Sequence, residues 1–235
     1  MPAAVGPWQA NCYVVATGPG RRDLPADCVV IDPGMGALAV VADVCDRHHL
    51  RVAGVIATHG HLDHIADATA VADAAGVAVH IHPDDEHLLT RPLEGLSVDL
   101  ADMVRGLGAD RLPAPRRVEY LEDGVTLEAA GVRFGLLHAP GHTPGCTLLV
   151  LDGVLLGDAG EPSRLVFTGD VLFAGSIGRM DLPGGDPAAM RHTLDTVVRA
   201  LPASAYLLPG HGPATTMAAE RATNPYLSPS AAPLS

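Results

Sequence analysis

Aromatic residues, basic residues and long hydrophobic runs are all scarce in this 235-residue chain. Only 3% of its residues are Phe, Trp or Tyr although 48% are hydrophobic, so Ala, Val and Leu must fill the core. Lys and Arg number 15 against 27 Asp and Glu, which gives a net charge of −12. Because non-specific affinity for nucleic acids comes from basic side chains that neutralise phosphates, a nucleic-acid partner is disfavoured. No apolar run approaches the roughly 20 residues of a membrane-spanning helix, so we predict no membrane partner.

Cysteine is also sparse. The four thiols of Cys12, Cys28, Cys45 and Cys146 are widely spaced and include no Cys-x-x-Cys pair. This pattern is not typical of a disulfide framework or a structural zinc site, and it predicts free, mostly buried thiols in a reducing compartment. Residues 1–20 contain no Lys or Arg and no continuous apolar segment, unlike a secretory signal. We therefore predict a cytoplasmic protein.

The densest group of potential metal ligands lies in residues 58–64, whose sequence is THGHLDH. His59, His61, Asp63 and His64 fall within six positions, directly after an apolar run. Imidazole and carboxylate are ligands that first-row divalent metals accept. Surface loops can carry histidines by chance, but four such side chains after a buried strand are more typical of a metal site.

Three later apolar segments also end in a turn that contains a potential ligand. His142 lies in the sequence APGHTPG, Asp170 ends the sequence FTGD, and His211 lies in the sequence LPGHG. Small, turn-forming neighbours allow the backbone and a ligand to approach a shared centre. Each turn alone is a weak signal, but four strand ends with ligands predict one common site. The irregularly spaced histidines at positions 48, 49, 80, 82, 87 and 192 are predicted to be structural or exposed.

The hydrophobic pattern predicts an α/β protein. Residues 36–50 have the apolar spacing of a helix, and a buried strand, a helix at 64–75 and another strand at 77–81 follow. This β-α-β alternation indicates a sheet with helices on its faces. Asp186 and Pro187 predict an N-cap and the first position of a later helix. Residues 83–115 form the least regular part, and connections of this length often form lids or substrate-facing loops.

The motif HxHxDH, followed by separate His, Asp and His residues, resembles the signature of the metallo-β-lactamase-fold hydrolases. Within that superfamily the chain looks most like the glyoxalase II (hydroxyacylglutathione hydrolase) group, especially its short bacterial members without the C-terminal helical domain. The resemblance runs from residue 11 to residue 226 and includes the sequence GRMDLPGG at 178–185. It implies a single domain over residues 1–235, folded as a four-layer αββα sandwich with metals at one edge of two sheets. Residues 226–235, rich in Ser, Pro and Ala, are expected to fray.

The resemblance also implies a two-metal centre, with three residues on each ion and one carboxylate bridging them. The first set is His59, His61 and His142, the second is Asp63, His64 and His211, and the bridge is Asp170. We predict two divalent ions, zinc before iron or manganese, because His/Asp sites accept all three. Such centres lower the pKa of bound water towards neutrality. A metal-bridging hydroxide is then expected to attack an acyl thioester such as S-lactoylglutathione, with Asp63 and Asp170 as the catalytic carboxylates.

Full-length glyoxalase II enzymes hold the glutathione carboxylates with basic residues of the C-terminal domain, and only 24 residues follow His211 here. Arg179 is the first candidate for binding substrate in their place, and Arg221 is the second. A salt bridge for Arg179 and an anchoring role for Arg221 are equally compatible with the sequence. The thiol of the small-molecule substrate therefore stays open between glutathione, another low-molecular-weight thiol and a different ester.

Two other functions are alternatives. A persulfide dioxygenase of the same fold binds a single iron and shares a Gly-Arg-x-Asp sequence, but its last motif usually contains Pro-Ala-His instead of Pro209-Gly210-His211. A non-catalytic metal-binding member of the fold is disfavoured because all seven ligand positions are retained. Lactamase and nuclease members fit less well, since the former are usually exported and the latter need basic surfaces. The sequence makes no prediction of the oligomeric state.

Overall fold

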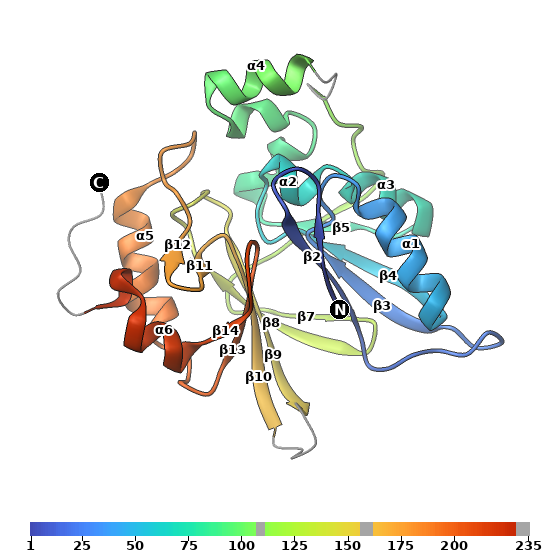
Figure 1. Cartoon of the computed structure of the whole chain (residues 1–235). Coiled ribbons are helices and arrows are strands. Elements are labelled where there is room, and N and C mark those ends of the chain that lie inside the picture. Colours follow the sequence, from blue (N-terminus) through green and yellow to red (C-terminus); the bar gives the residue numbers. More distant parts are fainter. Residues whose placement is uncertain (107–110, 156–161, 229–235) are drawn as a thin grey trace.

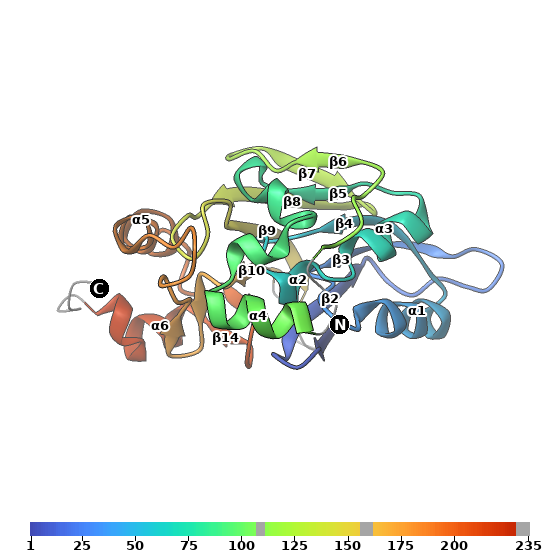
Figure 2. The same cartoon turned by 90° about the horizontal axis from the view of Figure 1, so that it is seen from above.

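The computed structural model describes residues 1–106, 111–155 and 162–228. Two six-stranded sheets lie face to face in this part of the chain (Figure 1). Helices cover the outer face of each sheet: Figures 1 and 2 show α5 and α6 on one side of the paired sheets and α1 and α3 on the other.

The first sheet contains six strands in chain order. They are β1 (Pro2–Val5), β2 (Ala10–Ala16), β3 (Ala26–Ile31), β4 (Leu50–Ile56), β5 (Val79–Ile81) and β6 (Val118–Tyr120). The pairs from β3 to β6 are parallel, so each needs a crossover connection. The helices of the first two crossovers are α1 (Ala37–His48), α2 (Leu62–Ile65) and α3 (Ala68–Ala75). The predicted β-α-β alternation is confirmed, although two helices replace the single helix expected at 64–75.

The second sheet has the order β14-β13-β10-β9-β8-β7. Its strands are β7 (Thr126–Ala129), β8 (Val132–His138), β9 (Thr147–Leu155), β10 (Pro162–Gly169), β13 (Tyr206–Pro209) and β14 (Thr215–Thr216). A two-stranded ribbon of β11 (Leu172–Phe173) and β12 (Ser176–Ile177) follows β10. The helices on this side are α5 (Pro187–Thr193), which continues as a π-helical turn at Leu194–Val198, and α6 (Met217–Thr223). Asp186 caps α5 as predicted, because its carboxylate accepts hydrogen bonds from the Ala188 and Ala189 amides at 2.7 and 3.1 Å.

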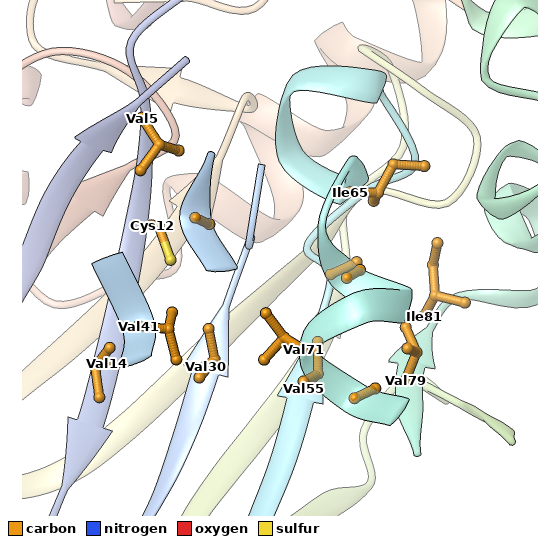
Figure 3. Packing of buried hydrophobic residues seen from close by; sticks show 14 of the residues in the cluster. Val5, Cys12, Val14, Val30, Val41, Val55, Ile65, Val71, Val79 and Ile81 are labelled. Atoms are coloured by element: carbon orange, nitrogen blue, oxygen red, sulfur yellow. The ribbon is translucent and has the colours of Figure 1, made fainter. Parts of the chain in front are cut away.

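Three hydrophobic clusters separate the four layers. The first lies between α1, α3 and the first sheet, and Figure 3 shows Val41 and Val71 of these helices beside Val30 and Val55 of the strands. The second lies between the two sheets, where Phe134 meets residues of both. The third packs the second sheet against α5 and α6. The predicted αββα sandwich is therefore confirmed, and small aliphatic side chains dominate its interior as the composition requires.

The segment expected to be irregular, residues 83–115, is mostly helical where it is described. It contains the 3₁₀ helices η1 (Pro83–Leu89) and η2 (Pro92–Gly95) and the helix α4 (Val98–Gly106). Figure 1 shows α4 at the same end of the molecule as α2. The prediction of an irregular connection was wrong because Pro83 and Pro92 start helical turns here, as proline can at a first helical position. Whether the segment moves as a lid stays a prediction.

The expected tail also differs at its start. Pro225–Leu227 forms a short 3₁₀ helix, η4, and Leu227 is buried in the third hydrophobic cluster. Residues 226–228 are thus packed, contrary to the predicted fraying, while residues 229–235 lie outside the described part. All four cysteines are free, and three of them are buried, as predicted. No helix among the described residues is long and apolar enough to cross a membrane.

Candidate metal centre

The seven predicted ligands meet at one edge of the two sheets. His59 follows the end of β4, and His61 precedes α2, the helix that presents Asp63 and His64. The other three ligands follow strands of the second sheet: His142 lies between β8 and β9, Asp170 follows β10, and His211 follows β13. Strands β10 and β13 are parallel neighbours, so their carboxyl ends bring Asp170 and His211 to the same edge.

The donor atoms form two groups that share a carboxylate between them. One group is His59, His61 and His142, and another is Asp63, His64 and His211, each with donor atoms within 4.8 Å of one another. Asp170 lies between the groups: its carboxylate oxygens are 3.5 Å from Nε2 of His142, 3.4 Å from Nε2 of His64 and 3.5 Å from Nε2 of His211. His59, His64 and Asp170 also form such a group, which crosses the two predicted sets. The structure thus brings the seven predicted side chains together, and the assignment of each to one ion or to the bridge stays a prediction.

Several of these donors are buried without a hydrogen-bond partner among the described residues. They are Nε2 of His59, Nε2 of His61 and Oδ1 of Asp170. In addition, Nδ1 of His61 lies only 2.8 Å from Nε2 of His142. Buried polar atoms without partners are costly, and lone pairs that converge on one point need a cation between them. The donor set therefore suits divalent metal ions, since imidazole and carboxylate are their common ligands.

The outer nitrogen of three histidines is held by the protein. The Nδ1 of His142 donates to the backbone carbonyl of Arg179 at 2.7 Å. The Nδ1 of His59 lies 3.2 Å from the hydroxyl of Thr58, and Nδ1 of His64 lies 3.2 Å from the carboxylate of Asp32. A carbonyl or carboxylate can only accept, so the rings of His142 and His64 carry a proton on Nδ1. Such partners fix the ring and leave Nε2 free for a metal.

Asp32 is a buried residue that the sequence analysis did not single out. Its carboxylate accepts the Thr58 amide at 2.7 Å and the Thr58 hydroxyl at 2.8 Å, in addition to His64. Its backbone has a φ of 50°, which is strained for a non-glycine residue. Asp32 thus fixes the start of the HxHxDH segment, and the strain is compensated by these bonds. The Asp-Pro-Gly sequence at 32–34, directly after the apolar residues 28–31, was the sequence signal that could have identified it.

Asp85 is a second buried carboxylate that sequence analysis missed, and it joins the two loops of the first ligand group. It accepts the Gly60 amide at 2.8 Å, between His59 and His61. It also accepts the Thr143 hydroxyl at 2.6 Å and the Gly145 amide at 2.8 Å, next to His142. The side chain of Asp85 therefore sets the distance between the two loops. No local pattern marks it, because its exposed neighbour Asp84 looks the same in sequence.

The packing around Asp170 requires glycine at two positions. A Cβ on Gly210 would lie 2.1 Å from Oδ1 of Asp170, and a Cβ on Gly178 would lie 1.8 Å from its backbone oxygen. Both distances are far shorter than a non-bonded contact allows, so a larger residue at position 210 would displace the carboxylate of Asp170 and one at position 178 would displace its backbone. These glycines confirm the inference that small neighbours permit a close approach to the centre.

Charge and burial shift the pKa values of the histidines at the centre in two opposite directions. Burial, together with the neighbouring His142 ring, lowers the pKa of His61 to about 3, and burial lowers the pKa of His59 below its ordinary value. Burial also opposes protonation of His64, but the carboxylates of Asp170 and Asp63 outweigh it and raise the pKa of its imidazole to about 10. His59 and His61 are thus neutral at neutral pH, whereas His64 holds a proton when no cation is bound.

Metal uptake by the metal-free protein is therefore expected to release protons, because a ligating imidazole must give up its proton. His64 contributes to this release, and so does His211, whose pKa is also raised. The raised pKa keeps His64 protonated until the pH approaches 10, so the apparent metal affinity should increase with pH up to that value. Calorimetric titration with zinc in two buffers of different protonation enthalpy measures the release. Uptake between pH 6 and 9 with no proton exchanged would contradict the assignment of His64 as a ligand.

A pocket of about 400 Å³ opens over the centre. Five of the predicted ligands line it, together with seven apolar residues and two polar ones. The apolar residues are Trp8, Leu62, Leu96, Leu100, Phe173, Ile177 and Leu182, and the polar ones are Ser176 and Arg179. Leu96 and Leu100 come from the 83–115 segment, which therefore faces the pocket. A larger cavity of about 730 Å³ elsewhere contains none of the seven ligands in its lining and is remote from this chemistry.

A family model described as the Metallo-beta-lactamase superfamily matches residues 5–211, which include all seven donors of the centre. The chain belongs to this superfamily. An uncharacterized protein of Mycobacterium tuberculosis is 38% identical over 218 residues, with 92% of each chain covered. The Haemophilus influenzae protein named hydroxyacylglutathione hydrolase GloC is 29% identical over 222 residues, which are 94% of this chain and 93% of its own.

Solved structures of the superfamily are also similar over nearly the whole chain. The crystal structure of the BLEG-1 B3 metallo-beta-lactamase has a TM-score of 0.76 and 29% identity, and covers 97% of this chain and 99% of its own. The crystal structure of TTHA1623 in a di-iron-bound form has a TM-score of 0.72 and 34% identity, and covers 97% of this chain and 100% of its own.

The remaining residues singled out in the sequence lie outside the group of seven predicted ligands. Arg221 donates to the backbone carbonyl of Arg199 at 2.8 Å and anchors α6, so it does not line the pocket. His192 is exposed on α5, as predicted. His80 pairs with Glu119, and His82 stacks on His138 with ring centroids 4.2 Å apart. Arg179 alone of the two predicted substrate-binding arginines faces the pocket.

Proposed function

We propose that this protein is a metal-dependent hydrolase of acyl thioesters, of the glyoxalase II type within the metallo-β-lactamase superfamily. The observation that supports it best is the pair of donor groups with Asp170 between them, because such a set suits two ions. The relative GloC is named a hydroxyacylglutathione hydrolase, and the similar protein TTHA1623 has a di-iron-bound form. Both are consistent with this proposal. We propose a cytoplasmic enzyme that acts on a small molecule, with zinc as the first candidate metal and iron or manganese as alternatives.

Each residue of the centre would have a definite task. One ion would be held by His59, His61 and His142. The other would be held by Asp63, His64 and His211. Asp170 would bind both ions. When bound, two divalent ions supply a water-derived nucleophile near neutral pH and polarise the carbonyl of a bound ester.

The protein itself orients the donors and surrounds the reacting group. Asp32 and the Arg179 carbonyl hold the rings of His64 and His142 in place. The apolar side chains of the pocket wall keep bulk water away from a bound acyl group, which strengthens electrostatic interactions there. A thiol has a pKa near 8.5, so a thiolate leaves readily and the site needs no dedicated general acid.

The alternative function, a persulfide dioxygenase with a single iron, needs a different set of metal ligands. Its site needs two histidines and one carboxylate, whereas seven donors converge here in two groups. The second group of Asp63, His64 and His211 offers a second ion a set of donors, which an enzyme with one iron would leave without a metal. This observation favours the hydrolase, and it also weighs against a non-catalytic member of the fold.

Metal analysis and two substrate assays test the proposal. The protein loaded with zinc or iron is expected to hold about two ions per chain and to release thiol from S-lactoyl thioesters. One iron per chain, with oxygen uptake on a persulfide and no thioester turnover, would instead establish the dioxygenase. A chromogenic β-lactam is assayed as a second class of substrate because the chain is similar to BLEG-1. Turnover of that compound alone would replace the thioester assignment.

A further inference from the structure

The β11–β12 ribbon forms one wall of the metal pocket, because Phe173, Ser176 and Ile177 belong to it and line the pocket. The ribbon follows Asp170 closely in the chain. The ring of Phe173 lies nearly perpendicular to the ring of His211, with centroids 6.1 Å apart. The position of the ribbon therefore decides how close this wall lies to the predicted ligands.

The ribbon is too short to hold this position by itself. Each of its strands has two residues, and an isolated two-stranded hairpin is at best marginally stable in water. Leu172 and Ile177 bury their side chains in the third hydrophobic cluster, but apolar contacts have no preferred direction. Directional contacts come from α6, which Figure 1 shows on the same side of the molecule as the ribbon.

Two buried polar side chains, one in α6 and one at its C-cap, supply these contacts. Glu220 and Asn224 are each 2% exposed, and Nδ2 of Asn224 donates to Oε2 of Glu220 at 2.9 Å. The same Oε2 accepts the backbone amide of Gly175, at the turn of the ribbon, at 2.8 Å. Nδ2 of Asn224 also lies 3.1 Å from the carbonyl oxygen of Ser176 and 3.5 Å from that of Phe173. Three backbone groups of the ribbon are thus held by two side chains.

The other carboxylate oxygen of Glu220 joins the ribbon to the segment that follows His211. Oε1 accepts the hydroxyl of Thr215, on β14, at 2.6 Å. A buried carboxylate is tolerated when hydrogen bonds satisfy its oxygens, and three donors do so here. Neither Glu220 nor Asn224 lines the pocket, so an effect of either on a substrate must pass through the segments that they hold.

We propose that Glu220 and Asn224 are positioning residues for substrate binding. They hold the β11–β12 ribbon so that Phe173 and Ile177 contact the apolar part of a bound substrate. The inference rests on the proposed thioester hydrolysis and adds the part of the site that sets substrate affinity. Contacts that a bound substrate and its transition state make equally change KM and leave kcat nearly constant.

Asn224→Ala removes the contacts to Ser176 and Phe173 without a change in the pocket lining. On the metal-loaded protein, KM for S-lactoylglutathione is expected to rise about tenfold, while kcat changes less than about twofold. The matched control is Thr223→Ala at the adjacent residue, whose exposed hydroxyl bonds to the Ala219 carbonyl within α6 at 2.9 Å. Its kinetics are expected to stay at the wild-type level. An unchanged KM in Asn224→Ala, or a loss of metal in place of the rise in KM, would overturn the inference.

A double-mutant cycle shows whether the effect passes through Phe173. Phe173→Ala removes the ring from the wall and is expected to raise KM about tenfold. Because Asn224 acts through the ribbon that carries this ring, adding Asn224→Ala to Phe173→Ala is expected to raise KM less than about twofold further. General loss of stability would not depend on the ring, so fully additive effects would contradict the proposal.

Glu220→Ala and Glu220→Gln test the hydrogen bonds themselves. The alanine variant loses all three bonds and is expected to raise KM as Asn224→Ala does. In the glutamine variant the amide oxygen can accept from Gly175 and Asn224, and the amide nitrogen can donate to the Thr215 hydroxyl. This variant is therefore expected to recover most of the loss, and an equal loss in both variants would overturn the inference. The control is Glu128→Ala, the same change at a side chain that is 68% exposed. If Glu220→Ala does not fold, the cycle of Asn224→Ala carries the test.

Binding without turnover separates this inference from the proposed function. The probe is benzyl mercaptan, a thiol with an apolar ring, and calorimetry on the metal-loaded protein measures its affinity. Asn224→Ala and Phe173→Ala are expected to weaken its binding about tenfold, and Thr223→Ala is expected to leave it unchanged. This result supports the inference even if no thioester is turned over, which would count against hydrolysis alone. Equal affinities of the wild type and Asn224→Ala would overturn the inference, whether or not the protein hydrolyses thioesters.

Discussion

Replacement of Asp170 with alanine is expected to abolish thioester hydrolysis and to lower the metal content. Asp170 lies within 3.5 Å of Nε2 atoms in both donor groups, so its removal affects both ions at once. Loss of an outer partner of a metal ligand costs about 10- to 100-fold in affinity or activity. Because Asp170 is proposed to bind both ions directly, the loss is expected to exceed that range. Elemental analysis and thiol release measure the two effects.

The control for this variant is His192→Ala. His192 is exposed on α5 and outside the pocket lining, so its removal is expected to leave metal content and kinetics nearly unchanged. A large loss in His192→Ala would show that α5 contributes to the site in a way the structure does not suggest. Full activity in Asp170→Ala would show that this carboxylate is not a ligand and would contradict the two-metal proposal.

Asp85→Asn is expected to weaken metal binding at the His59, His61 and His142 group by about 10- to 100-fold, although Asp85 is not a ligand. Its carboxylate accepts three hydrogen bonds, from Gly60, Thr143 and Gly145. An amide has one acceptor oxygen and one donor nitrogen, so at least one of these buried donors loses its partner. A buried unsatisfied donor costs about 1–3 kcal/mol. The two ligand loops are then no longer held at a fixed distance.

Titration of the metal-free variant against a competing chelator measures this loss. Asp84→Asn is the matched control, because it makes the same chemical change at the adjacent residue, whose side chain is 56% exposed. Thermal unfolding of the metal-free forms separates lost stability from lost ligand geometry. Unchanged metal affinity in Asp85→Asn would show that the loops keep their spacing without this carboxylate.

The side chains that gather at the centre were predictable because local sequence marks them. The HxHxDH motif places four side chains within six positions, and Gly/Pro turns mark the loops of His142 and His211. The helix start at Asp186 was equally local, since a cap depends on two adjacent residues. The αββα arrangement came from resemblance to a known superfamily, and the three clusters of the core bear it out.

The sequence by itself thus determined which residues meet at the centre and the kind of fold that brings them together. The tertiary structure decided how they are held, through Asp85, whose partners are 25 to 60 residues away, and through Asp32, which is 32 residues from His64. It also decided what surrounds them, because apolar side chains from distant segments converge on one pocket while Arg179 pairs with Asp181. The physical reason is the separation along the chain of the residues that decide each feature. Ligand motifs and turns depend on neighbouring residues, whereas buried hydrogen bonds and pocket walls depend on how the two sheets pack.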